Sequence, residues 1–590
     1  MRRLLSVLLA MAMAAALVPA GLAELVQEKD SFAKEGSGDG LHTIAEKDVT
    51  MYIGSMDAWE DVKLYFVDGV EDLPWMELKA FADFFTTLRS TYGKEPNYRL
   101  DFTAEGDTAR ITRETDYYME IDCAQDTIYF DDFDGFRHDT KDTSLLDMVA
   151  EPGYDSEGNP QLIKRLQDTN YDRYGIDILL ELGNYDIDIF HQGAGYYIPM
   201  QTLSDFLVAP AMNSCLFYNG KAAFFGNKDT FGVPGESLTP MGEYYYSAEP
   251  GPRSEVLAEY GYSELCLMLD NLYGLSDIHD IEMFDRFFYQ TGMTEDLMST
   301  DPATADQALY DLITLHLDDL HSVLMGHSPA AGKTRPSGGL GIAARKSNED
   351  EYFFRSARQK YYPDGCPFYE EVGNTAYITF DRFISEYYGH AFYNAFDAGD
   401  PLPEDTIGNI ILAHDTIYRV NSPVENVVID LSCNGGGSVD AAIFLLGWIL
   451  GDATFALKNT FTGAQSTAQY RIDVNLDRLF DSRDEVDDKN VYCLISPNSF
   501  SCGNLVPMAF KASPRVKLLG STSGGGTCIV QNMSTAWGDY FTMSGTDRMS
   551  FQKNGSFYDI DRGVEPDFPI DKVDHYYDRQ ALTEYINSFF

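Results

Sequence analysis

The chain has 590 residues, 44% of them hydrophobic, and it carries a formal net charge of −50 at pH 7. This length predicts about two to four domains with enough apolar residues for their cores. The strong negative charge argues against nucleic acid and anionic membranes as partners, because both repel an acidic protein. The eight cysteines leave disulfide pairing open, and no Cys/His spacing is typical of zinc, so we expect no metal and no cofactor.

Residues 1–23 are predicted to be a secretory signal peptide. Two arginines precede an apolar stretch from Leu4 to Val18, and small residues lead up to Ala23. The stretch is short for a bilayer span, although an uncleaved anchor is the alternative. We expect cleavage after Ala23, a secreted or extracytoplasmic location, and no membrane span in the remaining chain.

Residues 24–47 are polar and glycine-containing and are predicted to form a linker. Residues 48–250 alternate short strands with helices, which predicts small α+β modules. The stretch Leu73–Phe81 matches Ile198–Phe206, since both place a proline early in a helix with apolar residues on one face. This weak repeat resembles the copper amine oxidase N-terminal-like module, and a chance pair of proline-capped helices is the alternative.

Residues 251–330 are predicted to form a helical bundle. Its last helix is expected over Ala303–Leu324, where apolar residues recur at helical spacing, with His321 at its end.

Residues 331–590 are predicted to form an α/β domain that carries the chemistry. Two apolar strands, Val427–Leu431 and Val491–Ile495, are each followed by a tight turn and a helix, expected over Val439–Leu450 and Leu505–Lys511. Strand, turn and helix repeated in this way indicate parallel strands with right-handed crossovers. Ligands of such sheets bind at the carboxyl ends of the strands, where both turns lie.

One turn offers glycine amides and the other offers a serine. Ser501 at a helix start could act as a nucleophile, while Gly436 or Gly437 and the amide of Cys502 could hold an oxyanion. For Ser501 alone, an ordinary helix N-cap is the alternative, and Ser499 could equally be that cap.

A nucleophilic serine needs a base, and an acid that orients the base. His321 is the most suggestive base; the competing histidines and the available acids are His316, His327, His390, His414, Asp559, Asp561 and Glu565.

Four motifs in this order resemble the C-terminal processing (tail-specific) serine peptidases: 430–437, 500–504, the glycine loop 520–526, and 563–567. The resemblance covers about 300–590. It implies a multidomain α+β and α/β protein whose crotonase-like ββα sheet domain follows a helical bundle. It assigns Ser501 as nucleophile, Gly436 or Gly437 with Cys502 as oxyanion hole, and His321 to the family's Asp-x-His-Ser motif.

The chain also departs from the family pattern. Many members use a serine–lysine dyad, but the lysine position holds Gly526, and the family's arginine before the glycine turn is Ser432. The segment 327–371 is too short for the PDZ domain of many members. These departures point to a Ser-His-acid branch similar to tricorn, with His321 as base and Asp561, or failing that Asp559, orienting it.

The sequence therefore predicts an exported serine endopeptidase that cleaves protein or peptide substrates through an acyl-enzyme. One alternative is a catalytically inactive peptide- or ligand-binding protein on the same fold. Another places the nucleophile at Cys502, one residue along, where a helix start would point the side chain away from the site. Cleavage specificity and oligomeric state stay open.

Overall fold

The computed structural model describes residues 41–54, 56, 58–92, 98–113, 117–137, 158–166, 170–553 and 556–589. The predicted signal peptide lies outside these residues, as does most of the predicted linker. Strand β1 begins at Ile44, so the last residues assigned to the linker belong to a sheet. None of the helices within the described ranges is both long and apolar enough to cross a membrane.

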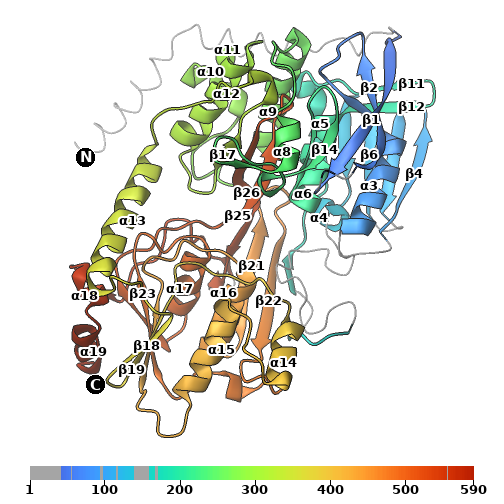
Figure 1. Ribbon diagram of the computed structural model, residues 1–590. Coiled ribbons are helices and arrows are strands. Elements are labelled where there is room, and N and C mark those ends of the chain that lie inside the picture. Colours follow the sequence, from blue (N-terminus) through green and yellow to red (C-terminus); the bar gives the residue numbers. More distant parts are fainter. Residues whose placement is uncertain are drawn as a thin grey trace, which may run out of the picture.

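The N-terminal region contains two sheets, drawn in blue and cyan in Figure 1. A seven-stranded sheet has the order β11-β12-β3-β2-β1-β14-β13, and an antiparallel five-stranded sheet has the order β10-β7-β6-β5-β4. Helix α3 (Leu78–Tyr92) buries its apolar face between them. The strands are β1 Ile44–Ile53, β2 Ala58–Val67, β3 Trp75–Glu77, β4 Leu100–Glu105, β5 Thr108–Arg113, β6 Tyr117–Asp122, β7 Thr127–Phe130, β10 Ile178–Glu181, β11 Phe190–Gln192, β12 Gly195–Pro199, β13 Cys215–Tyr218 and β14 Ala223–Gly226.

The two matched proline segments lie next to each other in the seven-stranded sheet. Strands β3 and β12 pair in antiparallel orientation with Pro199 opposite Trp75, and each strand leads directly into a helix. The N–H of Met200 donates to the carbonyl of Pro74 at 3.0 Å. The matched segments therefore belong to one sheet.

The helical region comprises α9 (Glu255–Leu272), α10 (Phe284–Thr291), α11 (Thr294–Leu297) and α12 (Pro302–Asp311), and α12 continues as a π-helical turn to Leu317. The predicted helix to Leu324 is wrong. Asp318 adopts a left-handed conformation with φ 45°, which ends the helix, and Val323–Gly326 form strand β17. His321 therefore lies in the connecting turn rather than on a helix.

The C-terminal region is built on a six-stranded sheet with the order β18-β19-β20-β23-β24-β29. From β19 onward neighbouring strands are parallel, as the repeated strand–turn–helix pattern predicts. Its elements are α13 Ile342–Tyr361, β18 Tyr369–Val372, β19 Thr375–Thr379, α14 Gly389–Ala398, α15 Thr406–Ile417, β20 Asn426–Asp430, α16 Val439–Leu450, β23 Asn490–Ile495, α17 Cys502–Lys511, β24 Val516–Gly520, β29 Phe568–Pro569, α18 Asp574–Tyr577 and α19 Arg579–Asn587.

A fourth large sheet collects strands from three distant parts of the chain. Its order is β17-β26-β21-β22-β8, with β25 paired to β26 and β9 paired to β22. Figure 1 shows these long orange and red strands between the N-terminal sheets and the C-terminal domain. The strands are β8 Ile163–Arg165, β9 Asn170–Arg173, β21 Ala453–Asn459, β22 Gln465–Ile472, β25 Cys528–Ser534 and β26 Tyr540–Ser550.

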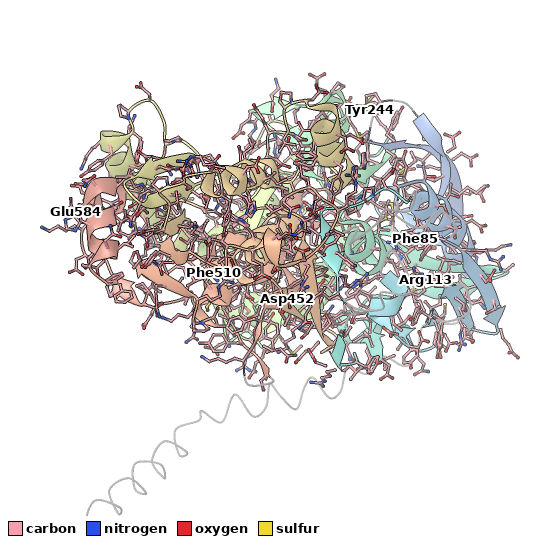
Figure 2. All side chains as sticks on the ribbon, turned by 90° about the horizontal axis from the view of Figure 1, so that it is seen from below. Phe85, Arg113, Tyr244, Asp452, Phe510 and Glu584 are labelled. Carbon is pink, nitrogen blue, oxygen red and sulfur yellow. The ribbon has the colours of Figure 1, made fainter. Side chains whose placement is uncertain are left out.

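Two main hydrophobic cores include residues of this sheet, and β26 contributes Phe541 to one and Met549 to the other. The first contains Phe85 of α3 and continues through α9 and α12 to Phe541 of β26. The second contains Phe510 of α17 and the apolar faces of β20, β23 and α16. Figure 2 shows Phe85 and Phe510 in separate parts of the molecule. The protein is thus a multidomain mixed α/β structure whose parts share a sheet.

Candidate active site

The two predicted turns meet at the carboxyl ends of the neighbouring strands β20 and β23. Phe500 N–H donates to the carbonyl of Asn434 at 3.0 Å, which links one turn to the other. The buried hydroxyl of Ser499 donates to the carbonyl of Leu431 at 2.7 Å, and that of Ser496 donates to the carbonyl of Ser432 at 2.5 Å. These bonds fix the serine turn against the glycine turn.

Ser501 has a backbone conformation that side chains with a Cβ rarely adopt. Its φ is 56° and its ψ is −124°, at the residue directly before helix α17. Its N–H donates to the carbonyl of Gly525 at 2.9 Å, but its side chain makes no capping hydrogen bond to the helix. The ordinary N-cap interpretation therefore fails for Ser501, while the Ser499 hydroxyl is used in joining the turns.

The glycine turn lies directly against the side chain of Ser501. A Cβ on Gly436 would come within 2.6 Å of the Ser501 Cβ, so only glycine allows this approach. The N–H of Gly436 donates to the side-chain oxygen of Asn434 at 2.9 Å. In the hydrogen bonding of the described chain, the N–H groups of Gly437 and Cys502 have no acceptor. These two amides are thus available for an oxyanion, whereas that of Gly436 is occupied.

The thiol of Cys502 is poorly suited to be the nucleophile. The residue is 1% exposed and its sulfur donates to the carbonyl of Gly437 at 3.2 Å. Burial, together with the nearby charge of Asp440, raises the pKa of the Cys502 thiol to about 12. Almost no thiolate is present at neutral pH, which removes the reactive form.

The imidazole of His321 packs on the residue that precedes Ser501. The centroids of the His321 and Phe500 rings are 4.7 Å apart, and His321 is 8% exposed. Burial lowers the pKa of His321, and the charge of Asp319 opposes this only in part. A neutral ring at neutral pH is the form that a general base requires. No hydrogen bond joins either ring nitrogen to Ser501 Oγ or to a carboxylate of the described residues.

Asp319 precedes His321 by two residues and holds the turn that carries it. Its carboxylate accepts hydrogen bonds from the N–H of His321 at 2.9 Å and the hydroxyl of Ser322 at 2.5 Å. It also accepts from Tyr273 at 3.0 Å and from Ser544 of β26 at 2.9 Å. Asp319 therefore holds the turn that carries His321 onto β26. The signal was an Asp two residues before a polar residue, which is typical of an Asx turn.

The three candidate orienting acids lie in different surroundings. Asp561 Oδ1 accepts from the N–H of Thr527 at 3.3 Å, and burial raises the pKa of this carboxyl. Asp559 pairs with Arg548 at 3.2 Å, and Glu565 is exposed. None of the three is hydrogen-bonded to His321.

The side chains of His414, His327 and Lys511 each interact with a group other than Ser501. His414 Nδ1 accepts from the indole of Trp448 at 3.0 Å, and His327 Nε2 lies 3.2 Å from the carbonyl of Gly332. Lys511 is ion-paired with Asp567. At Gly526, a Cβ would lie 2.5 Å from the Phe500 ring.

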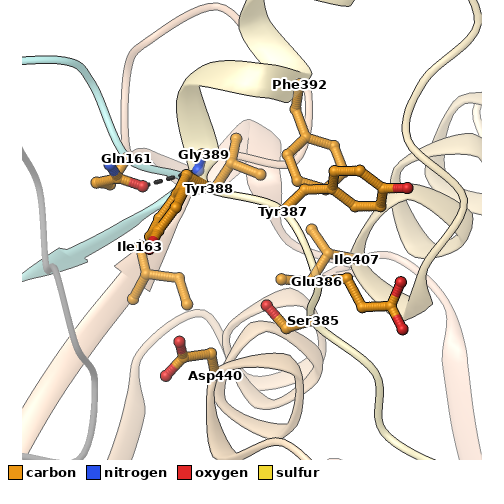
Figure 3. Close-up of a pocket in the computed structure, with 11 residues that line it drawn as sticks. Gln161, Ile163, Ser385, Glu386, Tyr387, Tyr388, Gly389, Phe392, Ile407 and Asp440 are labelled. Atoms are coloured by element: carbon orange, nitrogen blue, oxygen red, sulfur yellow. Dashed lines mark hydrogen bonds between the residues drawn. The ribbon is translucent and has the colours of Figure 1, made fainter. Parts of the chain in front are cut away.

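A pocket of about 250 Å³ is lined by residues that include Asp440, in the first turn of the helix that follows the glycine turn. Ser385 and Glu386 line it just after Phe383, whose N–H donates to the Gly436 carbonyl at 2.8 Å. Figure 3 shows the rings of Tyr387 and Phe392 on one side and the carboxylate of Asp440 on another. The pocket thus offers aromatic and acidic surface, and its lining includes neither Ser501 nor the candidate oxyanion amides.

The variant Gly436→Ala is expected to lower kcat for peptide hydrolysis by about 10²-fold, because a displaced nucleophile loses its alignment with the substrate. The new methyl group would collide with Ser501, at a glycine whose φ is 100°. Steady-state kinetics on a quenched fluorescent peptide measures the loss.

Gly435→Ala is the matched control, because a Cβ there meets no atom within 4 Å. It should retain activity within a few-fold of wild type. Equal losses in both variants would contradict the assigned contact between Gly436 and Ser501.

Residues 375–570 match the family model of peptidase family S41. Among solved structures, a lipoprotein from Streptococcus agalactiae is 15% identical over 58% of this chain and 98% of its own, with a TM-score of 0.34. A putative peptidase from Parabacteroides merdae is 14% identical over 57% and 96%, with a TM-score of 0.38. Mature CPAF is 12% identical over 57% and 96%, with a TM-score of 0.37. No curated protein matches the chain.

Proposed function

We propose that this chain, whose residues 375–570 belong to the serine peptidases of family S41, is an exported endopeptidase that acts through an acyl-enzyme. Ser501 is the nucleophile and His321 is the general base. The observation that carries the proposal is the strained, uncapped Ser501 beside the unoccupied amides of Gly437 and Cys502. That arrangement is what acyl transfer requires.

In the proposed reaction, Ser501 Oγ attacks the carbonyl carbon of the scissile peptide bond while His321 accepts the hydroxyl proton. The N–H groups of Gly437 and Cys502 donate to the oxyanion of the tetrahedral intermediate. His321 then returns the proton to the leaving amine, and the C–N bond breaks. Water, deprotonated by His321, hydrolyses the acyl-enzyme and restores the serine.

We assign the general base and its orienting acid from the contacts around Ser501. The turn of His321 is held on β26 by Asp319, and its ring already contacts Phe500. We assign Asp561 as the orienting acid because it bonds Thr527, two residues after the Gly525 carbonyl that accepts from Ser501 N–H. A hydrogen bond between Ser501 and His321 forms on substrate binding, since such bonds often tighten only in the complex.

The remaining parts of the proposal concern fold and location. The parallel β19-β20-β23-β24 sheet with α16 and α17 supports a crotonase-like domain. The sequence pattern of residues 1–23 supports export. The substrates are proteins or peptides, and the Ser-His branch is favoured because Gly526 replaces the lysine.

A second candidate function is a peptide-binding protein that has lost activity. The absence of a hydrogen bond between Ser501 Oγ and His321 in the described chain favours it. Such a protein would bind peptides on the same fold, but its Ser501 would not react.

Labelling with a fluorophosphonate probe tests the proposal, because the probe reacts only with an activated serine. The folded protein should be labelled at one site, and peptide mass spectrometry should map the adduct to Ser501. Heat-denatured protein is the control and should stay unlabelled. A folded protein that is not labelled would favour the inactive binding protein.

A further inference from the structure

We propose that the loop from Asp473 to Asp484, between β22 and β23, binds one Ca²⁺ ion. Its sequence places oxygen-bearing side chains at the first, third, fifth, ninth and twelfth positions of a twelve-residue loop. That is the ligand spacing of EF-hand calcium loops. The five residues are Asp473, Asn475, Asp477, Asp481 and Asp484.

The backbone of the loop shares two features with calcium loops. The sixth position, which is glycine in EF-hands, is Arg478, and it adopts the left-handed conformation with φ 64°. Its N–H donates to Asp473 Oδ2 at 2.6 Å. The twelfth residue turns back toward the first, since Asp484 Oδ1 accepts from the N–H of Val474 at 3.0 Å. Both ends of the loop thus face each other.

An unsatisfied oxygen points to a missing ligand. Asp473 is 0% exposed, and its Oδ1 has no hydrogen-bond donor anywhere in the described chain. Its other oxygen accepts from Tyr393 at 2.7 Å and from Arg478 N–H. Buried carboxylate oxygens are normally paired or coordinate a metal. A bound cation would satisfy Asp473 Oδ1.

The side chains of Arg478 and Arg483 pair with carboxylates other than that of Asp473. Arg478 extends to Asp397, at 2.6 Å. Arg483 pairs with Asp477 and Asp481, each at 2.7 Å, and its side chain is largely exposed. In this arrangement no three acidic, His or Cys side chains of the described residues converge on one point. Ca²⁺ binding therefore requires Arg483 to release both carboxylates, and these then turn toward Asp473.

Calcium selectivity follows from the donors. All five side chains offer oxygen, and the carbonyl of Leu479 at the seventh position supplies the backbone ligand of an EF-hand. Hard oxygen donors suit Ca²⁺ or Mg²⁺ rather than zinc or copper. An irregular loop with several carboxylates fits the larger Ca²⁺ better than strict octahedral Mg²⁺.

The test is isothermal titration of the full-length, chelator-treated protein with CaCl₂. We expect saturable binding of one ion with Kd of about 10⁻⁵ to 10⁻³ M. The melting temperature should rise at saturating CaCl₂, and MgCl₂ should bind at least tenfold more weakly. Both readouts are independent of peptidase activity, so the result stands whether or not Ser501 is a nucleophile.

Asp473→Asn and Asp477→Asn should each weaken Ca²⁺ binding by at least tenfold. Asp477 is the safer position if Asp473→Asn fails to fold, because Asp473 is buried and Asp477 is partly exposed. Asp487→Asn is the matched control, since it removes the same charge just outside the loop and should bind like wild type. The proposal is overturned if wild type takes up no Ca²⁺, or if Asp477→Asn and Asp487→Asn bind it equally well.

Discussion

Ser501→Ala should abolish peptide hydrolysis, lowering kcat by about 10⁴- to 10⁶-fold, and should leave the melting temperature unchanged. The rate falls because no other described group in the site can form the acyl-enzyme, and loss of a catalytic serine elsewhere costs factors of this order. Stability is kept because Ser501 Oγ makes no hydrogen bond within the described chain. Alanine also tolerates the positive φ no worse than serine does.

Ser499→Ala is the matched control two residues away. Its hydroxyl donates to the carbonyl of Leu431 and accepts from the N–H of Ser496 at 3.0 Å, in a buried position. Its loss should reduce the unfolding free energy by about 1–3 kcal/mol and leave the serine reactive to a fluorophosphonate. The assignment of Ser501 fails if its alanine variant retains activity within tenfold of wild type.

His321→Gln should lower kcat/KM by about 10³- to 10⁵-fold and remove the acid limb of the pH–rate profile. In wild type, activity should rise with pH as the ring becomes neutral. Because burial lowers the pKa of His321, the midpoint of that rise should lie below 6.5. Measuring kcat/KM between pH 4 and 8 locates this midpoint. The unperturbed pKa of histidine is about 6.5.

His327→Gln provides the comparison, since burial also lowers the pKa of that ring. Its profile should keep the wild-type acid limb, because its Nε2 lies at the carbonyl of Gly332 rather than in the site. If the acid limb persists in His321→Gln and disappears in His327→Gln, the general base is His327 and the assignment of His321 is wrong.

The elements that carry strong local signals were predictable from the sequence. Helix α16 has the predicted bounds, because its N-cap Ser438, apolar body and terminal Gly451 all agree. The parallel order of β20 and β23 followed from the repeated strand, turn and helix. The close approach of the two turns followed from the same pattern.

Other features depended on contacts that no local pattern reveals. The helix predicted to Leu324 ends at Leu317, because pairing of β17 with β26 outweighs the apolar helical spacing. The local pattern also did not reveal that the Gly436 amide is occupied, because this depends on the side chain of Asn434. The part of Asp319 in holding the turn of His321 depends on Tyr273, directly after α9, and Ser544 of β26, which are more than 200 residues apart in the chain.

The shared sheet has a consequence for when the enzyme becomes competent. His321 sits beside β17, whose partner is β26, and Thr542 on β26 donates to the His321 carbonyl at 2.8 Å. Partners so distant in sequence meet late, because closing long loops costs chain entropy before any contact repays it. The turn of His321 and the turn of Ser501 therefore come together only once nearly the whole polypeptide is present. An incompletely synthesised chain would therefore lack this arrangement of the two turns.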